Sequence, residues 1–74
     1  MITVYSKENC PQCRVAIAML KAKRIEHSVL KLGQDYTADE LRAKAPNARQ
    51  VPQVFIGDEL IGGVPELQKR LLIM

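Results

Sequence analysis

The hydrophobic positions at the start of the chain predict a strand followed at once by a helix. Residues 2–5 read Ile-Thr-Val-Tyr, a β-branched and aromatic run that favours an extended strand. From Pro11 to about Lys23 most residues are strong helix formers. Apolar side chains recur in this segment at spacings of three and four, which places them on one helix face: Cys13, Ala16, Ile17 and Leu20. The first helix therefore has an apolar face with a cysteine at its N-terminal end.

The middle of the chain predicts a second strand and a second helix. Val29, Leu30 and Leu32 form a short β-prone run that ends at Gly33. Residues 37–40, Thr-Ala-Asp-Glu, have the capping-box pattern, in which the threonine hydroxyl and the glutamate carboxylate satisfy early backbone N–H groups. The helix that begins there should stop near Ala45, since proline and asparagine follow.

The last third predicts a hairpin and a final helix. Residues 53–56 and 59–61 are two apolar runs, joined by Gly57-Asp58, a two-residue connection that suits a tight turn. Pro65 fits the first turn of a helix, where its missing N–H is not needed. Two leucines four residues apart then share a face of that helix.

The predicted order is strand-helix-strand-helix-strand-strand-helix. The first two strands, joined through a helix, should run parallel with a right-handed crossover, whereas the hairpin strands are antiparallel. We therefore expect an α/β fold with a four-stranded mixed sheet and three helices that cover both faces. A chain of 74 residues without repeats or linkers has room for one domain, residues 1–74.

Composition and charge narrow the classes of function. The net charge is +3, but lysines and arginines are spread along the chain and the few aromatic residues are scattered, so we do not expect nucleic-acid binding. The N-terminal residues carry neither a basic leader nor a long apolar run, and we expect no secretory signal and no membrane span. The expectation is a cytoplasmic monomer.

The candidate chemistry lies in Cys10-Pro11-Gln12-Cys13, placed between the first strand and the first helix. Two cysteines at this spacing in the first helical turn can close reversibly into a disulfide, and the position between strand and helix is typical of a redox motif. Unpaired N–H groups at the helix start favour a thiolate at Cys10, so it is the candidate nucleophile. Cys13, on the buried side of the helix, is less accessible and is the candidate resolving thiol. Lys7 and Arg14 are close enough in sequence to add positive field.

Two other interpretations of the cysteine pair remain. A structural zinc site needs four ligands, and the chain offers two cysteines and one histidine, His27, so an intramolecular metal site is not expected. His27 is better explained as a surface residue at the start of the second strand. A metal or iron–sulfur cluster shared between two copies of the chain stays open as a binding-module alternative.

A second constellation supports redox chemistry. If the bond between Val51 and Pro52 is cis, the chain makes a tight turn that exposes the Val51 backbone to an extended peptide or tripeptide. Further on, Gly62-Gly63 leads into the last helix, where a ligand can approach the backbone and the helix N-terminus attracts a carboxylate. Each motif alone is typical of an ordinary turn, and only together with the cysteines do they indicate a substrate groove.

In these motifs the chain resembles the glutaredoxin family of the thioredoxin fold. Three segments carry the likeness: Val4-Tyr5-Ser6-Lys7 before Cys10-Pro11-Gln12-Cys13, then residues 51–57, then Ile61-Gly62-Gly63. The resemblance implies a cis bond before Pro52 and a glutathione groove. It makes Lys7 and Arg49 candidates for the glutathione carboxylates and the Val51 backbone a candidate for the cysteinyl unit. Gln12 and Pro52 are further candidates for substrate binding. The resemblance would set three further residues against the γ-glutamyl end: Gly63, Val64 and Glu66.

The family likeness implies a dithiol–disulfide oxidoreductase that reduces protein disulfides or glutathione mixed disulfides, with no tightly bound cofactor and glutathione as reductant. Two positions depart from the family: Gln12 stands where tyrosine is common, and Pro65 where a hydroxyl or acidic residue is common. Pro65 has no N–H to donate to a carboxylate. This leaves open the related small glutaredoxin-like proteins, which take electrons from thioredoxin reductase and reduce ribonucleotide reductase.

Overall fold

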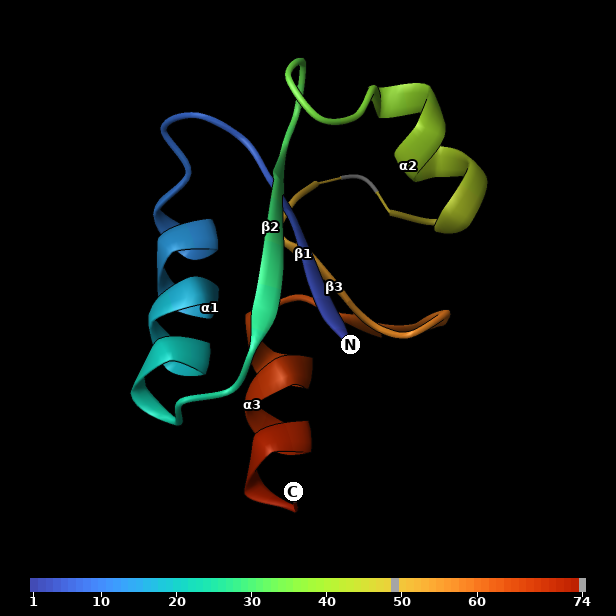
Figure 1. The fold of residues 1–74 in the computed structure, drawn as a ribbon. Coiled ribbons are helices and arrows are strands. Elements are labelled where there is room, and N and C mark those ends of the chain that lie inside the picture. Colours follow the sequence, from blue (N-terminus) through green and yellow to red (C-terminus); the bar gives the residue numbers. More distant parts are fainter. Residues whose placement is uncertain (49, 74) are drawn as a thin grey trace.

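The computed structural model describes residues 1–48 and 50–73, and it has the element order expected from the sequence (Figure 1). The elements are β1 (Ile2–Ser6), α1 (Pro11–Ala22), β2 (His27–Lys31), α2 (Ala38–Lys44), β3 (Gln53–Ile56), β4 (Glu59–Gly62) and α3 (Val64–Leu72). Within the described ranges no helix is both long and apolar enough to cross a bilayer.

The four strands form one mixed sheet in the order β2-β1-β3-β4. β1 runs parallel to β2 and antiparallel to β3, and β3 runs antiparallel to β4. The register pairs Tyr5 with Gln53, so the end of β1 lies beside the start of β3. The cysteine loop follows β1, and the Val51-Pro52 segment precedes β3. The two segments therefore meet at the same end of these neighbouring strands.

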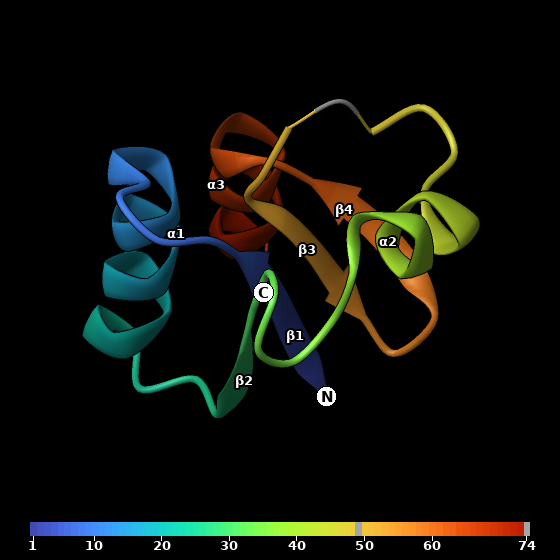
Figure 2. The same cartoon turned by 90° about the horizontal axis from the view of Figure 1, so that it is seen from above.

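The core has two parts, one on each face of the sheet, and Figure 2 shows α1 and α3 on one side and α2 on the other. Side chains alternate between faces along a strand, so Val4 points toward α1 and α3 while Tyr5 points toward α2. The α1/α3 side buries Ile2, Val4, Ala16, Leu20, Val54, Leu67 and Leu71. The α2 side buries Tyr5, Tyr36, Leu41, Ala45 and Phe55. Helices on both faces were expected, and the structure confirms this.

The ends of several elements differ from the sequence-based expectation. The second strand spans His27–Lys31, so it begins two residues before Val29, the first residue of the apolar run, and Leu32 lies beyond it in an isolated bridge with Tyr36. Ser6, expected in the loop, is the last residue of β1 and pairs with Lys31. The partner strand sets these ends, because β2 extends as far as β1 offers pairing positions. His27 does begin the strand, as expected.

Candidate active site

Cys10 is the cap of the first helix. Its backbone is extended, with φ −119° and ψ 98°, and its Sγ accepts the N–H of Cys13 at 3.1 Å. Asn9 has a φ of +53°, which turns the chain before the cap, and Pro11 opens the helix where no N–H is needed. A sulfur in this position lies against unpaired N–H groups and the positive end of the helix dipole. The local sequence thus creates a position that favours a thiolate at Cys10 once the pair is reduced.

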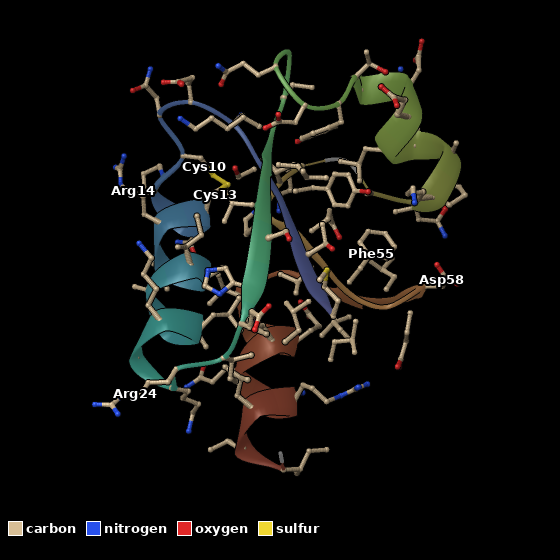
Figure 3. All side chains as sticks on the ribbon, in the orientation of Figure 1. Cys10, Cys13, Arg14, Arg24, Phe55 and Asp58 are labelled. Carbon is tan, nitrogen blue, oxygen red and sulfur yellow. A yellow bond between two sulfur atoms is a disulfide. The ribbon has the colours of Figure 1, made fainter. Side chains whose placement is uncertain are left out.

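Cys10 and Cys13 are joined by a disulfide, with their Cα atoms 5.2 Å apart (Figure 3). Cys10 is 6% exposed and Cys13 is 2% exposed, so Cys13 is the less accessible of the two, as expected. Cys10 is nevertheless more covered than the sequence suggested. Its sulfur is bonded to Cys13 and lies 3.9 Å from the carbonyl oxygen of Val51.

A cleft of about 240 Å³ beside the cysteine pair carries mostly positive charge. Its charged lining residues are Lys7, Arg14, Lys31 and Glu8. Glu8 pairs with Lys31 at 3.2 Å on the surface. Figure 3 shows the Arg14 side chain pointing away from the two sulfurs. Lys7 is therefore the better candidate of the two basic residues singled out near Cys10.

The Val51-Pro52 bond is cis, as the family resemblance implied. Val51 is half-buried and Pro52 is buried, next to the first residue of β3. The contact between the Val51 carbonyl and Cys10 Sγ, 41 positions away in the sequence, shows that the two motifs meet.

A groove of about 530 Å³ runs from this contact to the start of α3. It is lined by Gln12, Gln50, Val51, Pro52, Gln53, Gly62, Gly63, Val64, Pro65 and Glu66. Six of the residues proposed for substrate binding are thus brought together. Lys7 is not among the residues that line the groove; it lines two neighbouring pockets. Arg49 lies outside the described residues.

Glu66 has a role that sequence reasoning missed. Its Oε1 accepts the N–H of Gly63 at 2.9 Å, so the side chain caps the helix on which it lies. Pro65 has no backbone N–H. A carboxylate bound at this end of the groove therefore has one hydrogen-bond donor fewer than it would have with another residue at this position. The signal was present in the sequence, since a glutamate three residues after the cap position is half of a capping box.

Tyr36 is a second residue that sequence reasoning missed. Its buried hydroxyl donates to the carbonyl oxygen of Ser6 at 2.7 Å, and the same oxygen accepts the N–H of Leu32 at 2.9 Å. Burial, with a contribution from Tyr5, raises the pKa of Tyr36, so the hydroxyl keeps its proton near neutral pH. Ser6 is the last residue of β1, and this contact fixes the point from which the cysteine loop departs.

Replacing Tyr36 by phenylalanine is expected to lower the free energy of unfolding by about 1 kcal/mol, the typical worth of one hydrogen bond. The Ser6 carbonyl keeps its bond from Leu32, so it is not left without a partner. In a domain of this size the melting temperature should fall by roughly 4–8 °C. Thermal unfolding followed by circular dichroism measures the change.

Tyr5→Phe is the matched control. The Tyr5 ring packs edge-on against Tyr36 with centroids 4.9 Å apart, but its hydroxyl makes no hydrogen bond to the residues that the structure describes. Its removal should change stability by less than about 0.5 kcal/mol. Equal losses in the two variants would contradict the role assigned to the Tyr36 hydroxyl.

The comparisons with known proteins agree with this geometry. The family model described as Glutaredoxin matches residues 2–61. A probable glutaredoxin of Synechocystis sp. is 37% identical over 67 residues, which cover 89% of this chain and 76% of that protein. Glutaredoxin 3 of Escherichia coli K12 is 33% identical over 66 residues, covering 89% of this chain and 80% of the relative.

Solved structures show the same fold. A buckwheat glutaredoxin–glutathione complex superposes with a TM-score of 0.81 at 25% identity, covering 97% of this chain and 68% of that one. Reduced glutaredoxin of Escherichia coli gives a TM-score of 0.82 at 22% identity, covering 97% and 93% of the two chains. The family model covers most of the sequence, and two relatives exceed 30% identity over nearly nine-tenths of it. The chain therefore belongs to the glutaredoxin family of thiol–disulfide oxidoreductases.

Proposed function

We propose that this chain reduces protein disulfides and glutathione mixed disulfides, with Cys10 as the attacking thiolate and Cys13 as the resolving thiol, and that glutathione restores the dithiol. The observation that carries the proposal is the position of the Cys10 sulfur. It lies at the N-terminus of α1 and 3.9 Å from the Val51 carbonyl, where the groove begins. The proposal includes a cytoplasmic location, where thiols are kept reduced.

The reaction is an exchange of sulfur–sulfur bonds. The Cys10 thiolate attacks one sulfur of the substrate disulfide, so that one S–S bond forms, one breaks, and the departing thiolate takes a proton from water. Cys13, as a thiolate, then attacks the Cys10 sulfur and releases the second substrate thiol. Two electrons have passed from the dithiol to the substrate, and Cys10 and Cys13 are joined. Two molecules of glutathione then reduce the Cys10–Cys13 disulfide to the dithiol and leave as glutathione disulfide.

The groove offers a surface for an extended thiol tripeptide. The backbone of Val51 can pair with the cysteinyl unit in strand fashion, close to the sulfur that it must reach. Lys7 borders the groove, because it lines the neighbouring pocket together with Val51, and its ammonium group can take a carboxylate there. The structural neighbour from buckwheat was solved with glutathione, which supports extending this ligand to the present chain.

A second candidate function has a specific observation in its favour. Pro65 supplies no N–H, and Glu66 already occupies the N–H of Gly63, so a γ-glutamyl carboxylate meets fewer donors and one negative charge at that end. Such a groove would suit a protein that takes electrons from thioredoxin reductase and passes them to a protein disulfide, as in ribonucleotide reductase.

Turnover with the two electron sources separates these functions. With bis(2-hydroxyethyl) disulfide as substrate, glutathione plus glutathione reductase is expected to support a rate at least about tenfold above that with thioredoxin reductase. Replacing Pro65 by serine, which restores an N–H and adds a hydroxyl, should lower the KM for glutathione about three- to tenfold. NADPH consumption measures both quantities.

Pro46→Ser is the control for this substitution, since Pro46 is an exposed loop residue that does not line the groove. It should leave the KM for glutathione within about twofold of the unmodified protein, because no ligand contact changes. A faster reaction with thioredoxin reductase than with glutathione would reject glutathione as the reductant and favour the second candidate.

A further inference from the structure

A pocket of about 250 Å³ lies on the α2 side of the sheet, away from the cysteine pair. Its lining comes from β1, the end of α2, β3 and the turn after β3, and consists of Thr3, Tyr5, Lys44, Phe55, Gly57 and Asp58. None of these residues lines the groove or the cleft beside the cysteines. Figure 3 shows Phe55 and Asp58 across the strands from Cys10 and Cys13. The pocket is therefore separate from the site of disulfide exchange.

The short α2 leaves this part of the sheet open. The helix has seven residues and is about 10 Å long, whereas the five residues of β1 extend over roughly 17 Å. Thr3 and Tyr5 point to the same face because they are two positions apart, and Thr3 pairs with Phe55 in the register of the sheet. The pocket begins where α2 ends, at Lys44, and the turn between β3 and β4 forms its other side.

The Tyr5 hydroxyl faces this pocket without a hydrogen-bond partner among the described residues. Tyr5 is only 7% exposed, and the rings of Tyr36 and Phe55 pack edge-on against it, with centroids 4.9 and 5.4 Å away. Every fully buried side-chain oxygen or nitrogen of the described residues has a partner, so the Tyr5 oxygen reaches solvent, and Tyr5 lines this pocket. The fold thus holds a hydrogen-bond donor in a fixed place and does not use it.

Lys44 and Asp58 add one charge of each sign. Both residues are exposed, and neither forms an ion pair with another described residue. A simple anion in the pocket would pair with Lys44 but meet the charge of Asp58, and a simple cation would meet the opposite conflict. A ligand that carries both a carboxylate and an ammonium group can pair with both side chains.

We propose that this pocket binds a small zwitterion of the α-amino-acid class. Its carboxylate pairs with Lys44 and accepts the Tyr5 hydroxyl, its ammonium group pairs with Asp58, and an aliphatic side chain lies against the Phe55 ring. The site adds a function that the disulfide exchange at Cys10 does not require. Because both charges are open to water, the expected Kd is on the order of 1–10 mM.

Titration of the isotope-labelled protein with L-valine, followed by heteronuclear NMR, tests the site. The backbone amides of Thr3, Phe55, Gly57 and Asp58 are expected to shift together and to saturate. Two matched probes each lack one charge: isobutylamine has no carboxylate and isovalerate has no ammonium group. Isobutylamine should bind about fivefold more weakly than valine and isovalerate at least about threefold more weakly, because each loses a charge pair.

Three substitutions in the pocket should each remove one part of this preference. Tyr5→Phe removes the donor to the carboxylate, and Lys44→Gln removes the positive charge. In both variants the preference for valine over isobutylamine should fall to about twofold or less. Asp58→Asn should lower the preference for valine over isovalerate in the same way, since the ammonium group loses its partner.

Two matched controls lie outside the pocket. Tyr36→Phe also removes one hydroxyl, but this hydroxyl donates to the Ser6 carbonyl within the fold. Lys69→Gln removes an exposed positive charge from the last turn of α3, as Lys44→Gln does from the last turn of α2. Both controls should bind valine within about twofold of the unmodified protein. Thermal unfolding verifies that each variant is folded.

Several results would overturn the site. One is the absence of saturable shifts up to about 100 mM valine, well above the expected Kd. Others are binding of isobutylamine or isovalerate as tight as that of valine, preferences that the three pocket variants leave unchanged, and an equal loss in the controls. Reduction of bis(2-hydroxyethyl) disulfide depends on Cys10 and not on this pocket, so it reports on the proposed function independently.

Discussion

Cys10→Ser is expected to lower disulfide reduction at least about 1,000-fold, because the substitution removes the only proposed nucleophile. A serine hydroxyl is scarcely ionised near neutral pH and cannot form a disulfide with the substrate. The helix should survive, since serine is a preferred helix cap and its oxygen can accept the Cys13 N–H that the sulfur accepts now. Turnover with bis(2-hydroxyethyl) disulfide gives the rate, and circular dichroism shows that the fold is retained.

Cys13→Ser distinguishes the two cysteines. It keeps the attacking sulfur but removes the resolving thiol, so a covalent adduct between Cys10 and a peptide should accumulate and be visible by mass spectrometry. If Cys10→Ser retained activity, or if the adduct formed on Cys13 in a protein with Cys10 replaced, the assignment of roles would be wrong.

Features that depend on neighbouring residues could be predicted from the sequence. The capping box at the start of α2 is present as expected: Glu40 N–H donates to Thr37 Oγ1 at 3.1 Å and Thr37 N–H donates to Glu40 Oε1 at 2.9 Å. Cys10 caps α1 for the same local reason, since the residue before Pro11 is placed to bond the first free N–H groups. Three or four residues contain all the information needed for such a motif.

Features that depend on the pairing of distant segments could not be predicted in this way. Leu32 is apolar and β-prone, yet it falls outside β2, because β1 ends at Ser6 and offers it no position in the ladder. The hydrogen bond from Tyr36 to the Ser6 carbonyl joins residues 30 positions apart. Local pattern gives the type of an element, while its exact ends and its side-chain partners follow from the register of the sheet.

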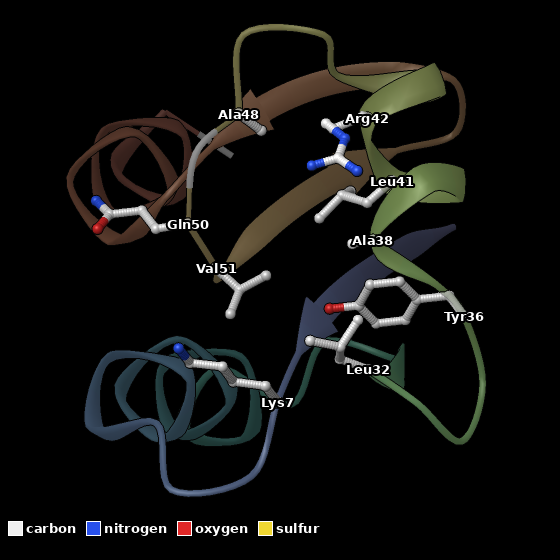
Figure 4. A pocket seen from close by; sticks show the side chains of 9 residues that line it. All are labelled: Lys7, Leu32, Tyr36, Ala38, Leu41, Arg42, Ala48, Gln50 and Val51. Atoms are coloured by element: carbon white, nitrogen blue, oxygen red, sulfur yellow. The ribbon is translucent and has the colours of Figure 1, made fainter.

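The same distinction applies to the candidate site. The meeting of Cys10 with Val51 was expected only through the resemblance to a family, and the physical cause is the antiparallel pairing of β1 with β3. The pocket beside the groove that Lys7, Arg42 and Val51 line (Figure 4) was not foreseen, because no motif marks it. It arises where α2 packs over the sheet beside the loop, and an arginine on a helix is by itself an ordinary surface residue.

Replacing Gly62 by alanine is expected to lower the free energy of unfolding by about 2–4 kcal/mol, which corresponds to a fall in Tm of roughly 8–32 °C. Gly62 has a φ of +123°, a conformation that residues with a Cβ rarely adopt. An added Cβ would lie 2.9 Å from Cγ and 3.0 Å from Cβ of Glu66. These atoms are close to the backbone of α3, so the side chain cannot move aside without giving up its cap on Gly63. Urea or thermal unfolding measures the loss.

Gly33→Ala separates backbone strain from this contact. Gly33 also has a positive φ, +88°, but no neighbouring atom lies within 4 Å of the place that a Cβ would take. Its substitution should cost only about 1–2 kcal/mol, the strain of a left-handed backbone in a residue that carries a Cβ. The difference between the two variants then reports the crowding between residue 62 and Glu66 at the end of the groove. An equal loss would mean that φ alone requires glycine at position 62, and that Glu66 does not hold its capping position against that glycine.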